Sequence, residues 1–542
     1  MRCLFIYPKF TAPSFWNYRA ACDLLGAKYP AAPLGLITVA AMLPESWEVR
    51  LIDMNVEPLS EEAIQEADLI LIGGMIAQQS EHLSLIDHFH TLGKTVIVGG
   101  PDATNSPHLY DKADHLILGE AEVTFKGFLK DFCSGRAQHI YSAKNEKADL
   151  STSPVPRFDL LKLSSYLHVG IQIGRGCPFK CEFCDIIELF GRVPRLKPPS
   201  QVLHELDVLY SLGYRGHVDI VDDNFIGNRE SAKKFLVELH SWLKTHNWPF
   251  EFSTEASLNL AKDPELLRLM QEVGFCAVFV GVESPDEHTL RAMQKQQNTI
   301  APIPESTHEI LRHGMVVNAG YIVGFDTESG SIAENVLELI EATSIPVNMV
   351  GLLYALPSTQ LSKRLQKEGR LHEHFDIAPT EVACQSVAGL NFETRRPRSA
   401  ILSDYKKIVE QSYAAAKYFG RIRRSLRIMN CSKKRLRLPI SKQLRDLQGF
   451  SRLLIKMGIE SRYRNEFWKT LFCCLFFNPR SLRYVVAMCA LYLHFDPFKE
   501  YVLSFISRDI EREEGGLDSY RTLRATSQFL QRGFEGVVST EI

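Results

Sequence analysis

Short apolar runs alternate with amphipathic stretches along the first part of the chain. Helical stretches such as Gly35–Leu43 and Ser80–Leu92 separate the apolar runs. Strands that alternate with helices in this way predict an α/β domain with a parallel, doubly wound sheet. Such sheets bind ligands at the carboxyl ends of their strands. The predicted strands are Cys3–Tyr7, Glu48–Ile52, Leu69–Gly73, Thr95–Gly99 and His115–Leu118.

A second alternating series begins at Val169, after a polar stretch with prolines at 142–156 that indicates an interdomain linker. Six strand–helix units in one series predict a parallel barrel, complete or partial, with its chemistry at the C-terminal strand ends. The predicted strands are Val169–Ile173, Val218–Val221, Phe250–Ser253, Ala277–Gly281, Val316–Val323 and Val347–Leu353.

From about residue 385 the strand signals fade and helical, basic patterns take over. Between Arg421 and Arg445 there are ten Lys or Arg residues and no acidic residue. Such a run is either a solvated helix face or a surface for anionic lipid headgroups or another polyanion. The apolar run Tyr484–Phe495 predicts a buried helix, because it is shorter than the roughly 20 residues that span a bilayer.

These changes divide the 542 residues into a first domain at 1–141, a linker at 142–165, a barrel core at 166–375 and a mostly helical domain at 376–542. The formal net charge of −2 gives the chain no strong overall field, and we expect no nucleic-acid partner. We see no secretory signal and expect a cytoplasmic protein whose 12 cysteines are reduced. Nine of them stand singly or in apolar runs and are expected to be small core residues.

Three cysteines stand on one short loop, Cys177-Pro-Phe-Lys-Cys181-Glu-Phe-Cys184, directly after a predicted strand. Three thiolates on one loop can bind three irons of a four-iron cluster and leave the fourth iron open. A structural zinc site is the alternative, but it needs a fourth ligand at a familiar spacing. No second C-x-x-C and no H-x-x-x-H lies nearby in the sequence to supply that fourth ligand. The spacing therefore predicts a [4Fe-4S] cluster.

At these residues the sequence resembles the radical S-adenosylmethionine (SAM) superfamily. Its members carry C-x-x-x-C-x-aromatic-C after the first strand of a six-unit partial barrel, and Phe183 stands at the aromatic position. The resemblance implies that the methionyl amino and carboxylate groups of SAM chelate the open iron. It also implies that an electron from the cluster splits SAM and yields a 5′-deoxyadenosyl radical.

Residues at the later strand ends match the cofactor contacts of this superfamily one by one. The resemblance implies that Asp222 and Asp223 bind the methionyl amino group. It implies ribose and methionyl contacts for Glu255 and for Glu283-Ser284. Lys295 stands where a basic residue pairs with the methionyl carboxylate, and Gly324 closes the fifth-strand motif near the adenine. We assign no catalytic residue.

The N-terminal domain resembles the cobalamin-binding fold found ahead of some radical enzymes. Glycines at strand ends let the backbone approach a flat macrocycle and its nucleotide tail. Ordinary turn chemistry in a flavodoxin-like domain is the alternative interpretation. The matching residues are Gly35, Gly74, Met75, Gly99, Gly100, Gly119 and Glu120.

One loop departs from the pattern of cobalamin domains. Many of them carry D-x-H-x-x-G, whose histidine ligates cobalt. Here Asp53-Met-Asn55-Val-Glu-Pro58 has asparagine at the histidine position and proline at the glycine position. We therefore expect no histidine ligand from this loop, as is common in the radical subclass. Met75 is a candidate for an approach to the lower face of the cobalt.

The segments Gly351–Leu361 and Asn391–Arg395 resemble a subgroup that has a helical C-terminal domain. The best-known activity of this subgroup is methylation of hopanoids at ring carbon 2. The resemblance implies that the radical takes hydrogen from an unactivated carbon and that methylcobalamin supplies the methyl group. The alternatives are a cobalamin-dependent radical cyclase or rearrangement enzyme, and a non-catalytic cobalamin-binding carrier or sensor. The intact cysteines and the acidic strand ends argue against the latter.

The resemblance also implies the partners. We expect a small-molecule or lipid substrate, and an electron donor of the flavodoxin or ferredoxin type. The basic, apolar C-terminal region would suit a lipid derived from a membrane. We therefore also expect peripheral contact with the inner membrane surface.

Overall fold

The computed structural model describes residues 1–143, 146–372, 389–431 and 436–514. Its first sheet has six parallel strands in the order β3-β1-β4-β5-β6-β7. All five strands predicted for this region are confirmed, and β7 adds a sixth at the edge. The strands are β1 (Arg2–Tyr7), β3 (Glu48–Asp53), β4 (Leu69–Gly73), β5 (Val96–Gly99), β6 (His115–Leu118) and β7 (Ile140–Ser142).

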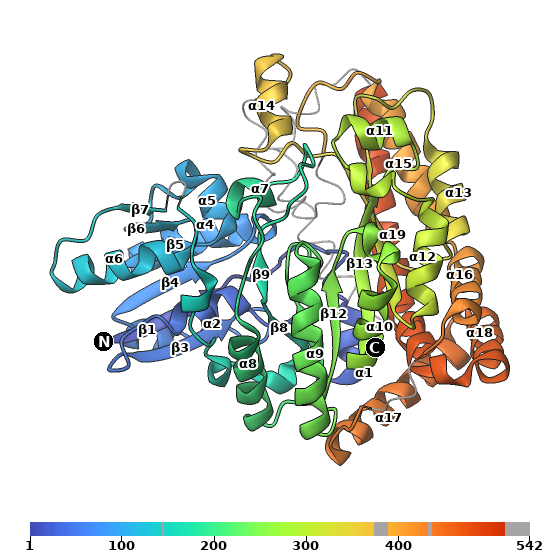
Figure 1. The fold of residues 1–542 in the computed structure, drawn as a ribbon. Coiled ribbons are helices and arrows are strands. Elements are labelled where there is room, and N and C mark those ends of the chain that lie inside the picture. The colour runs from blue at the N-terminus through green and yellow to red at the C-terminus, as the bar shows by residue number, and fades with distance from the viewer. Residues whose placement is uncertain (144–145, 373–388, 432–435, 515–542) are drawn as a thin grey trace.

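Helices cover both faces of this sheet, which is the doubly wound arrangement (Figure 1). The central strand β4 is buried along its whole length, as a parallel strand covered on both faces must be. The helices are α2 (Leu34–Ala40), α3 (Glu61–Glu66), α4 (Gln79–Thr91), α5 (Pro101–Asn105) and α6 (Ala121–Cys133).

The second sheet is an open parallel half-barrel in the order β15-β14-β13-β12-β11-β8-β2. The six predicted strands of the core are confirmed, with ends that shift by up to three residues. They are β8 (Tyr166–Ile171), β11 (Gly216–Ile220), β12 (Phe250–Glu255), β13 (Phe275–Glu283), β14 (Val316–Val323) and β15 (Asn348–Leu352). Its outer helices are α8 (Pro199–Ser211), α9 (Arg229–Thr245), α10 (Pro264–Val273), α12 (Ile303–Arg312) and α13 (Ala333–Thr343).

The seventh strand of the half-barrel comes from the N-terminal region. β2 (Tyr29–Ala31) pairs in parallel with β8, although it lies inside the range 1–141 that we expect to form the first domain. The helix before it, α1 (Arg19–Leu25), packs on C-terminal helices rather than on the first sheet. The sequence gives no sign of this exchange, because three residues carry too little periodicity to show which sheet they join.

The C-terminal region is helical, as expected. Its helices are α15 (Arg398–Ser412), α16 (Ala415–Ile428), α17 (Ile440–Ile455), α18 (Arg464–Phe477) and α19 (Leu482–Glu514), and α14 (Gln360–Lys367) precedes them within the range expected for the barrel core. The expected domain boundary between residues 375 and 376 lies outside the described residues. Helix α19 buries Val485, Cys489 and Phe495, which confirms the buried helix predicted for this run. Within the described ranges no helix is long and apolar enough to cross a membrane.

Within α16, three arginines of the basic stretch at 421–445 match neither of the two interpretations given above, because they are paired with acidic residues of neighbouring elements. The guanidinium of Arg421 is fully buried and lies 2.6 Å from Glu341. Arg424 also pairs with Glu341, and Arg423 pairs with Glu466 at 2.8 Å. These three arginines fix α16 to its neighbours and form neither a solvated face nor a free polyanion surface. Residues 432–435 of the stretch lie outside the described part of the chain.

Candidate functional site between the two sheets

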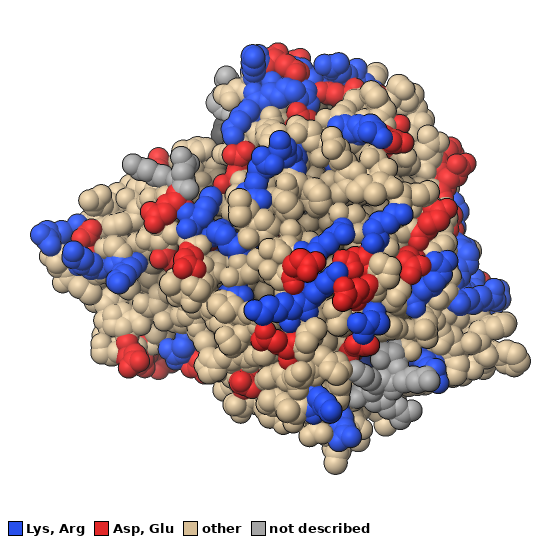
Figure 2. Space-filling model, in the orientation of Figure 1, with Lys and Arg blue, Asp and Glu red and all other residues tan. Residues whose placement is uncertain are grey.

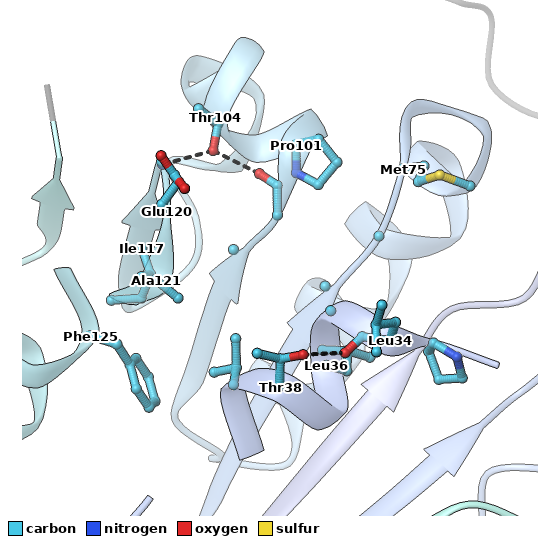
Figure 3. Close-up of a pocket in the computed structure, with 18 of the residues that line it drawn as sticks. Leu34, Leu36, Thr38, Met75, Pro101, Thr104, Ile117, Glu120, Ala121 and Phe125 are labelled. Atoms are coloured by element: carbon cyan, nitrogen blue, oxygen red, sulfur yellow. Dashed lines mark hydrogen bonds between the residues drawn. The ribbon is translucent and has the colours of Figure 1, made fainter. Parts of the chain in front are cut away.

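A cavity of about 520 Å³ opens at the carboxyl ends of the first sheet, where doubly wound folds bind ligands (Figure 3). Its lining includes all seven residues predicted from the cobalamin resemblance: Gly35, Gly74, Met75, Gly99, Gly100, Gly119 and Glu120. The half-barrel supplies the facing wall with Gln172, Arg175, Asp185, Ile186, Leu189, Phe190 and Val221. Asp185 directly follows Cys184, so the cavity extends to the cysteine loop.

Backbone crowding explains why glycines line this cavity. Gly100 has a φ of +101°, and a Cβ there would lie 3.2 Å from the Gly74 carbonyl oxygen. A Cβ at Gly99 would lie 3.1 Å from the Ile117 carbonyl oxygen. Gly119 has a φ of +83°, and a side chain there would press on Ala143. Side chains at these positions would be strained or would crowd neighbouring atoms, so glycine keeps the strand ends at the cavity bare, and the backbone there can approach a large ligand such as cobalamin.

The loop after β3 holds its asparagine away from the cavity. Asn55 accepts a hydrogen bond from the Phe10 backbone N–H at 2.9 Å. Its amide group donates to the Pro8 carbonyl and to the Asp53 carboxylate. These bonds tie the loop to the segment after β1, and Asn55 does not line the cavity. Met75 does line it, and Figure 3 shows its thioether at the cavity edge.

Buried ion pairs join the two halves of the cavity. Arg175 Nη1 lies 2.8 Å from Glu120 Oε2, and Arg175 Nη2 lies 2.8 Å from Glu122 Oε1. Arg195 also pairs with Glu120, whose side chain is only 2% exposed. Burial alone would raise the pKa of Glu122, but the Arg175 guanidinium holds it below its usual value. Sequence reasoning gave Glu120 as a cofactor contact and missed its arginine partners, although Arg175 stands beside the cysteine motif.

The cysteine loop is held in a tight turn that presents its sulfurs to amide donors. Gly176, with a φ of +97°, precedes it, and a Cβ there would lie 3.0 Å from two backbone carbonyl oxygens. Asn224 Nδ2 lies 3.8 Å from Cys177 Sγ, and Gln297 Nε2 lies 3.5 Å from Cys181 Sγ. Such N–H donors stabilise thiolates that ligate a cluster, so the residues present fit the iron–sulfur group. The sequence gave no signal for Gln297.

The two aspartates after β11 hold the backbone on either side of the turn that leads to this loop. Asp222 Oδ1 accepts from the Ile173 N–H at 2.7 Å, and Asp223 Oδ2 accepts from the Gly176 N–H at 2.8 Å. Burial raises the pKa of Asp222 to about 7 and that of Asp223 to about 6. Each carboxylate therefore positions the cysteine loop through a backbone group. Their contact with the methionyl amino group stays a prediction.

A buried ion pair lies beside the loop. Lys295 Nζ and Glu283 Oε1 are 2.5 Å apart, and Gly281 makes room for them because a Cβ there would overlap the Glu283 carboxylate. Glu283 takes a left-handed backbone conformation with a φ of +67°, which is costly for a residue with a side chain. Lys295 also lies over the Phe183 ring, with Nζ 5.7 Å from its centroid. The structure thus brings together three of the predicted cofactor contacts, which are Phe183, Glu283 and Lys295. Ser284 is buried next to Glu283.

The remaining predicted contacts lie at two strand ends. Glu255 ends β12 and is exposed on the inner side of the half-barrel. Desolvation inside the half-barrel raises its pKa to about 8, and repulsion from Asp219 and Asp223 adds to this effect. The Gly324 N–H donates to both oxygens of Glu328, at 3.0 and 3.1 Å. No ligand contact of Glu255 or Gly324 is established by these interactions.

Apolar side chains line part of the inner face of the half-barrel. Along β13 and β14 the alternate residues Val280 and Val323 are fully buried against the helices, whereas Phe279 and Ile322 are only partly buried. Trp16 reaches in from the N-terminal segment, and its ring lies 5.4 Å from that of Phe279. The half-barrel can therefore receive a substrate with a large apolar surface next to the cysteine loop.

Comparison with known proteins agrees with this geometry. Models of the B12-binding domain, the Radical SAM superfamily and a domain of unknown function match residues 23–129, 171–340 and 359–507. The chain is 39% identical to an uncharacterized methyltransferase of Synechocystis sp. over 94% of both chains. It is 34% identical to the hopanoid C-2 methylase of Rhodopseudomonas palustris, over 86% of this chain and 88% of that protein. The chain belongs to the cobalamin-dependent radical SAM methyltransferases.

Two solved structures of radical SAM enzymes share the fold. One is the cobalamin-dependent SAM radical enzyme OxsB with aqua-cobalamin and SAM bound. The superposition covers 96% of this chain and 83% of OxsB, with a TM-score of 0.58 at 15% identity. The radical SAM methyltransferase TsrM from Kitasatospora setae covers 68% of this chain and is covered to 78%, with a TM-score of 0.53 at 16% identity. The matches to the B12-binding and Radical SAM models show that this methyltransferase uses a [4Fe-4S] cluster, SAM and cobalamin. The cyclase and carrier alternatives are not favoured.

Proposed function

We propose that this methyltransferase methylates an unactivated carbon of a hopanoid lipid. The observation that carries the proposal is the 34% identity to the hopanoid C-2 methylase, which extends over 86% of the chain and so includes most of the helical C-terminal region. The partly buried aromatic and aliphatic side chains inside the half-barrel support it, because a polycyclic hydrocarbon needs such a surface.

The residues of the chain divide the work of binding and positioning. Cys177, Cys181 and Cys184 would ligate the cluster, and the amides of Asn224 and Gln297 would stabilise their sulfurs. The glycine-lined cavity would hold cobalamin against the same loop.

When bound, the cofactors supply the 5′-deoxyadenosyl radical and the methyl group. The half-barrel would hold the lipid between these two reagents and exclude water. We further propose that a flavodoxin or ferredoxin type donor reduces the cluster, and that the enzyme meets its lipid at a membrane surface.

Isotope transfer tests the proposal. The holoenzyme would be reconstituted anaerobically and given reductant, SAM with a deuterated methyl group, and hopanoid lipid that lacks the C-2 methyl group. We expect 5′-deoxyadenosine, S-adenosylhomocysteine and deuteromethylated hopanoid to rise together in mass spectra. The variant Cys181→Ala should form none of them, whereas Cys133→Ala, at an exposed cysteine far from the loop, should match the parent. Formation of 5′-deoxyadenosine without labelled hopanoid would overturn the substrate assignment.

A further inference from the structure

Exposed apolar side chains gather in one short part of the C-terminal region. Of the nineteen large apolar side chains that are exposed in the described residues, nine fall between 440 and 477. They form what we call the α17–α18 surface: Ile440, Leu444, Leu447, Ile455, Ile459, Phe472, Leu475, Phe476 and Phe477. Scattered apolar residues on a surface are ordinary, but a concentration of this size marks an interaction site.

Helix α17 turns its apolar stripe away from the protein. Ile440, Leu444 and Leu447 are spaced by four and three residues, so they lie on one face of the helix. The opposite face is packed: Leu453 is buried, and a Cβ at Gly449 would lie 2.8 Å from a Leu25 methyl carbon. Helix α17 therefore packs one face against the protein and leaves a second, apolar face exposed to solvent.

Helix α18 carries the aromatic residues of this surface. Phe476 is 86% exposed, and Phe472 stacks on Trp468 with ring centroids 5.7 Å apart. Trp468 Nε1 donates to the Gly458 carbonyl at 2.9 Å in the turn after α17, which ties the two helices together. Phe, Trp, Leu and Ile are the residues that helices use in the interfacial region of a bilayer.

Both helices lie at the same end of the half-barrel. Lys442 of α17 donates to the Arg215 carbonyl just before β11. Asn478, which ends α18, donates to the Met429 carbonyl, and Asn430 lies against Gly314 just before β14. The surface therefore lies at the N-terminal ends of the strands, opposite to the cysteine loop. In Figure 1, α17 and α18 occupy the lower right of the molecule.

The charge around the α17–α18 surface indicates which kind of partner binds there. From Arg437 to Arg480 there are nine Lys or Arg residues and three acidic residues. Arg452, Lys456 and Arg464 are among the exposed cations, and blue patches flank uncharged surface along this edge in Figure 2. In a dimer formed through this surface, positive charge on one copy would face positive charge on the other. An anionic lipid surface is complementary to this positive charge, because cations near such a surface are attracted to the lipid headgroups.

We propose that the α17–α18 surface docks the enzyme on the anionic face of a lipid bilayer, with its apolar side chains in the interfacial region. The inference deepens the proposed function, since a lipid substrate gives the docking its purpose.

Vesicle flotation of the full-length protein tests the docking. One set of vesicles holds equal parts of phosphatidylglycerol and phosphatidylcholine, and the other holds phosphatidylcholine alone. We expect the parent protein to float with the anionic vesicles and to be released by high salt. The triple variant Leu444→Ser, Leu447→Ser, Phe476→Ser should bind at least about tenfold more weakly, because three apolar side chains leave the interface. Val237→Ser on α9, at a valine that is 54% exposed, is the matched control and should float like the parent.

Equal flotation of the triple variant and the parent would overturn the inference. So would a parent dimer that the triple variant converts to monomer in light scattering, because the surface would then belong to a second copy. Activity separates this inference from the proposed function. The triple variant should methylate detergent-dispersed hopanoid like the parent and lose activity only on hopanoid in vesicles. If neither protein methylates hopanoid in any form, the proposed function fails while the flotation result still decides the docking.

Discussion

The Arg175 guanidinium bridges Glu120 and Glu122 across the boundary between the two sheets, with Nη1 2.8 Å from Glu120 and Nη2 2.8 Å from Glu122. Glu120 lines the glycine-rich cavity, and Arg175 stands two residues before Cys177. Under the proposed function, a methyl donor in the cavity and a radical source at the loop act on one carbon atom, so their separation has to be fixed. This buried bridge ties the cavity to the segment that leads into the cysteine loop.

Removing the bridge should loosen the two domains. Arg175→Ala leaves Glu122 buried without its cation, which costs roughly 3–5 kcal/mol of unfolding free energy for a buried pair. We expect a matching fall in stability by chemical denaturation and weaker retention of cobalamin on gel filtration. Arg268→Ala, which breaks an exposed pair with Glu272, is the control and should change stability by less than about 1 kcal/mol. An Arg175→Ala protein as stable as the parent would contradict this role.

The cysteine loop and the cobalamin cavity should be separable by mutation. Replacing Cys177, Cys181 and Cys184 by alanine together should abolish iron binding and turnover, because the cluster loses all three thiolates. Cobalamin should remain bound, since most of the residues that line the cavity belong to the N-terminal domain and not to the cysteine loop. Iron analysis and the cobalamin absorption spectrum measure both on one sample. Loss of cobalamin from this variant would show that the cavity depends on the cluster.

Gly281→Ala should disturb the ion pair beside the loop. The added methyl group would overlap the Glu283 carboxylate and would lie 2.6 Å from Lys295 Nζ, so the pair must move. If these residues contact SAM, the KM for SAM should rise by about tenfold or more, with iron content unchanged. Gly127→Ala in α6, where nothing lies within 4 Å of the new methyl group, is the control. It should raise stability by up to about 1 kcal/mol through helix propensity.

Asp222 should make stability depend on pH. Burial raises its pKa from 3.8 to about 7, so between these values the folded protein holds a proton that the unfolded chain releases. The stabilisation that this bound proton gives the folded protein is therefore complete below pH 3.8 and is lost as the pH rises through 7. Asp222→Asn cannot titrate. The Tm of the variant relative to the parent should thus be higher at pH 8 than at pH 5, and an equal difference at both values would rule out a raised pKa.

Asn55→His should fail to create a cobalt ligand. Asn55 is held by hydrogen bonds to Phe10, Pro8 and Asp53 and does not line the cavity. A histidine there should lower stability by the loss of these bonds, about 1 kcal/mol for each. The electron paramagnetic resonance spectrum of reduced cobalamin should show no nitrogen coupling from this residue. A nitrogen coupling that appears only in the variant would place this loop under the cobalt.

Local pattern was sufficient for most strands and for the seven predicted residues that line the cavity. Parallel strands covered by helices are apolar runs of four to eight residues, and such runs are visible without knowledge of their partners. The cavity residues were predictable for a related reason. Gly100 and Gly119 need backbone conformations that other residues avoid, so their positions mark strand ends in the sequence itself.

Partners distant in the chain were not predictable. Arg421 looked like one charge in a basic run, yet it is buried against Glu341, 80 residues earlier. Gln297 had no motif, and only the packing of its loop brings it to Cys181. The apolar stripe of α17 reads as an ordinary core-facing helix in the sequence, because hydrophobic periodicity does not show whether a face meets the core or solvent.

The sequence by itself determined the chemistry of the protein: three thiols within eight residues, and glycines at the ends of the strands that bear the cavity. These features are local, since each depends on spacing within a loop or on the φ of one residue. Only the tertiary structure decided that Arg175 joins the two domains, that β2 leaves its own sheet for the half-barrel, and that the apolar face of α17 stays exposed. Such outcomes depend on the packing of segments far apart in the chain, where many alternatives share the same local pattern.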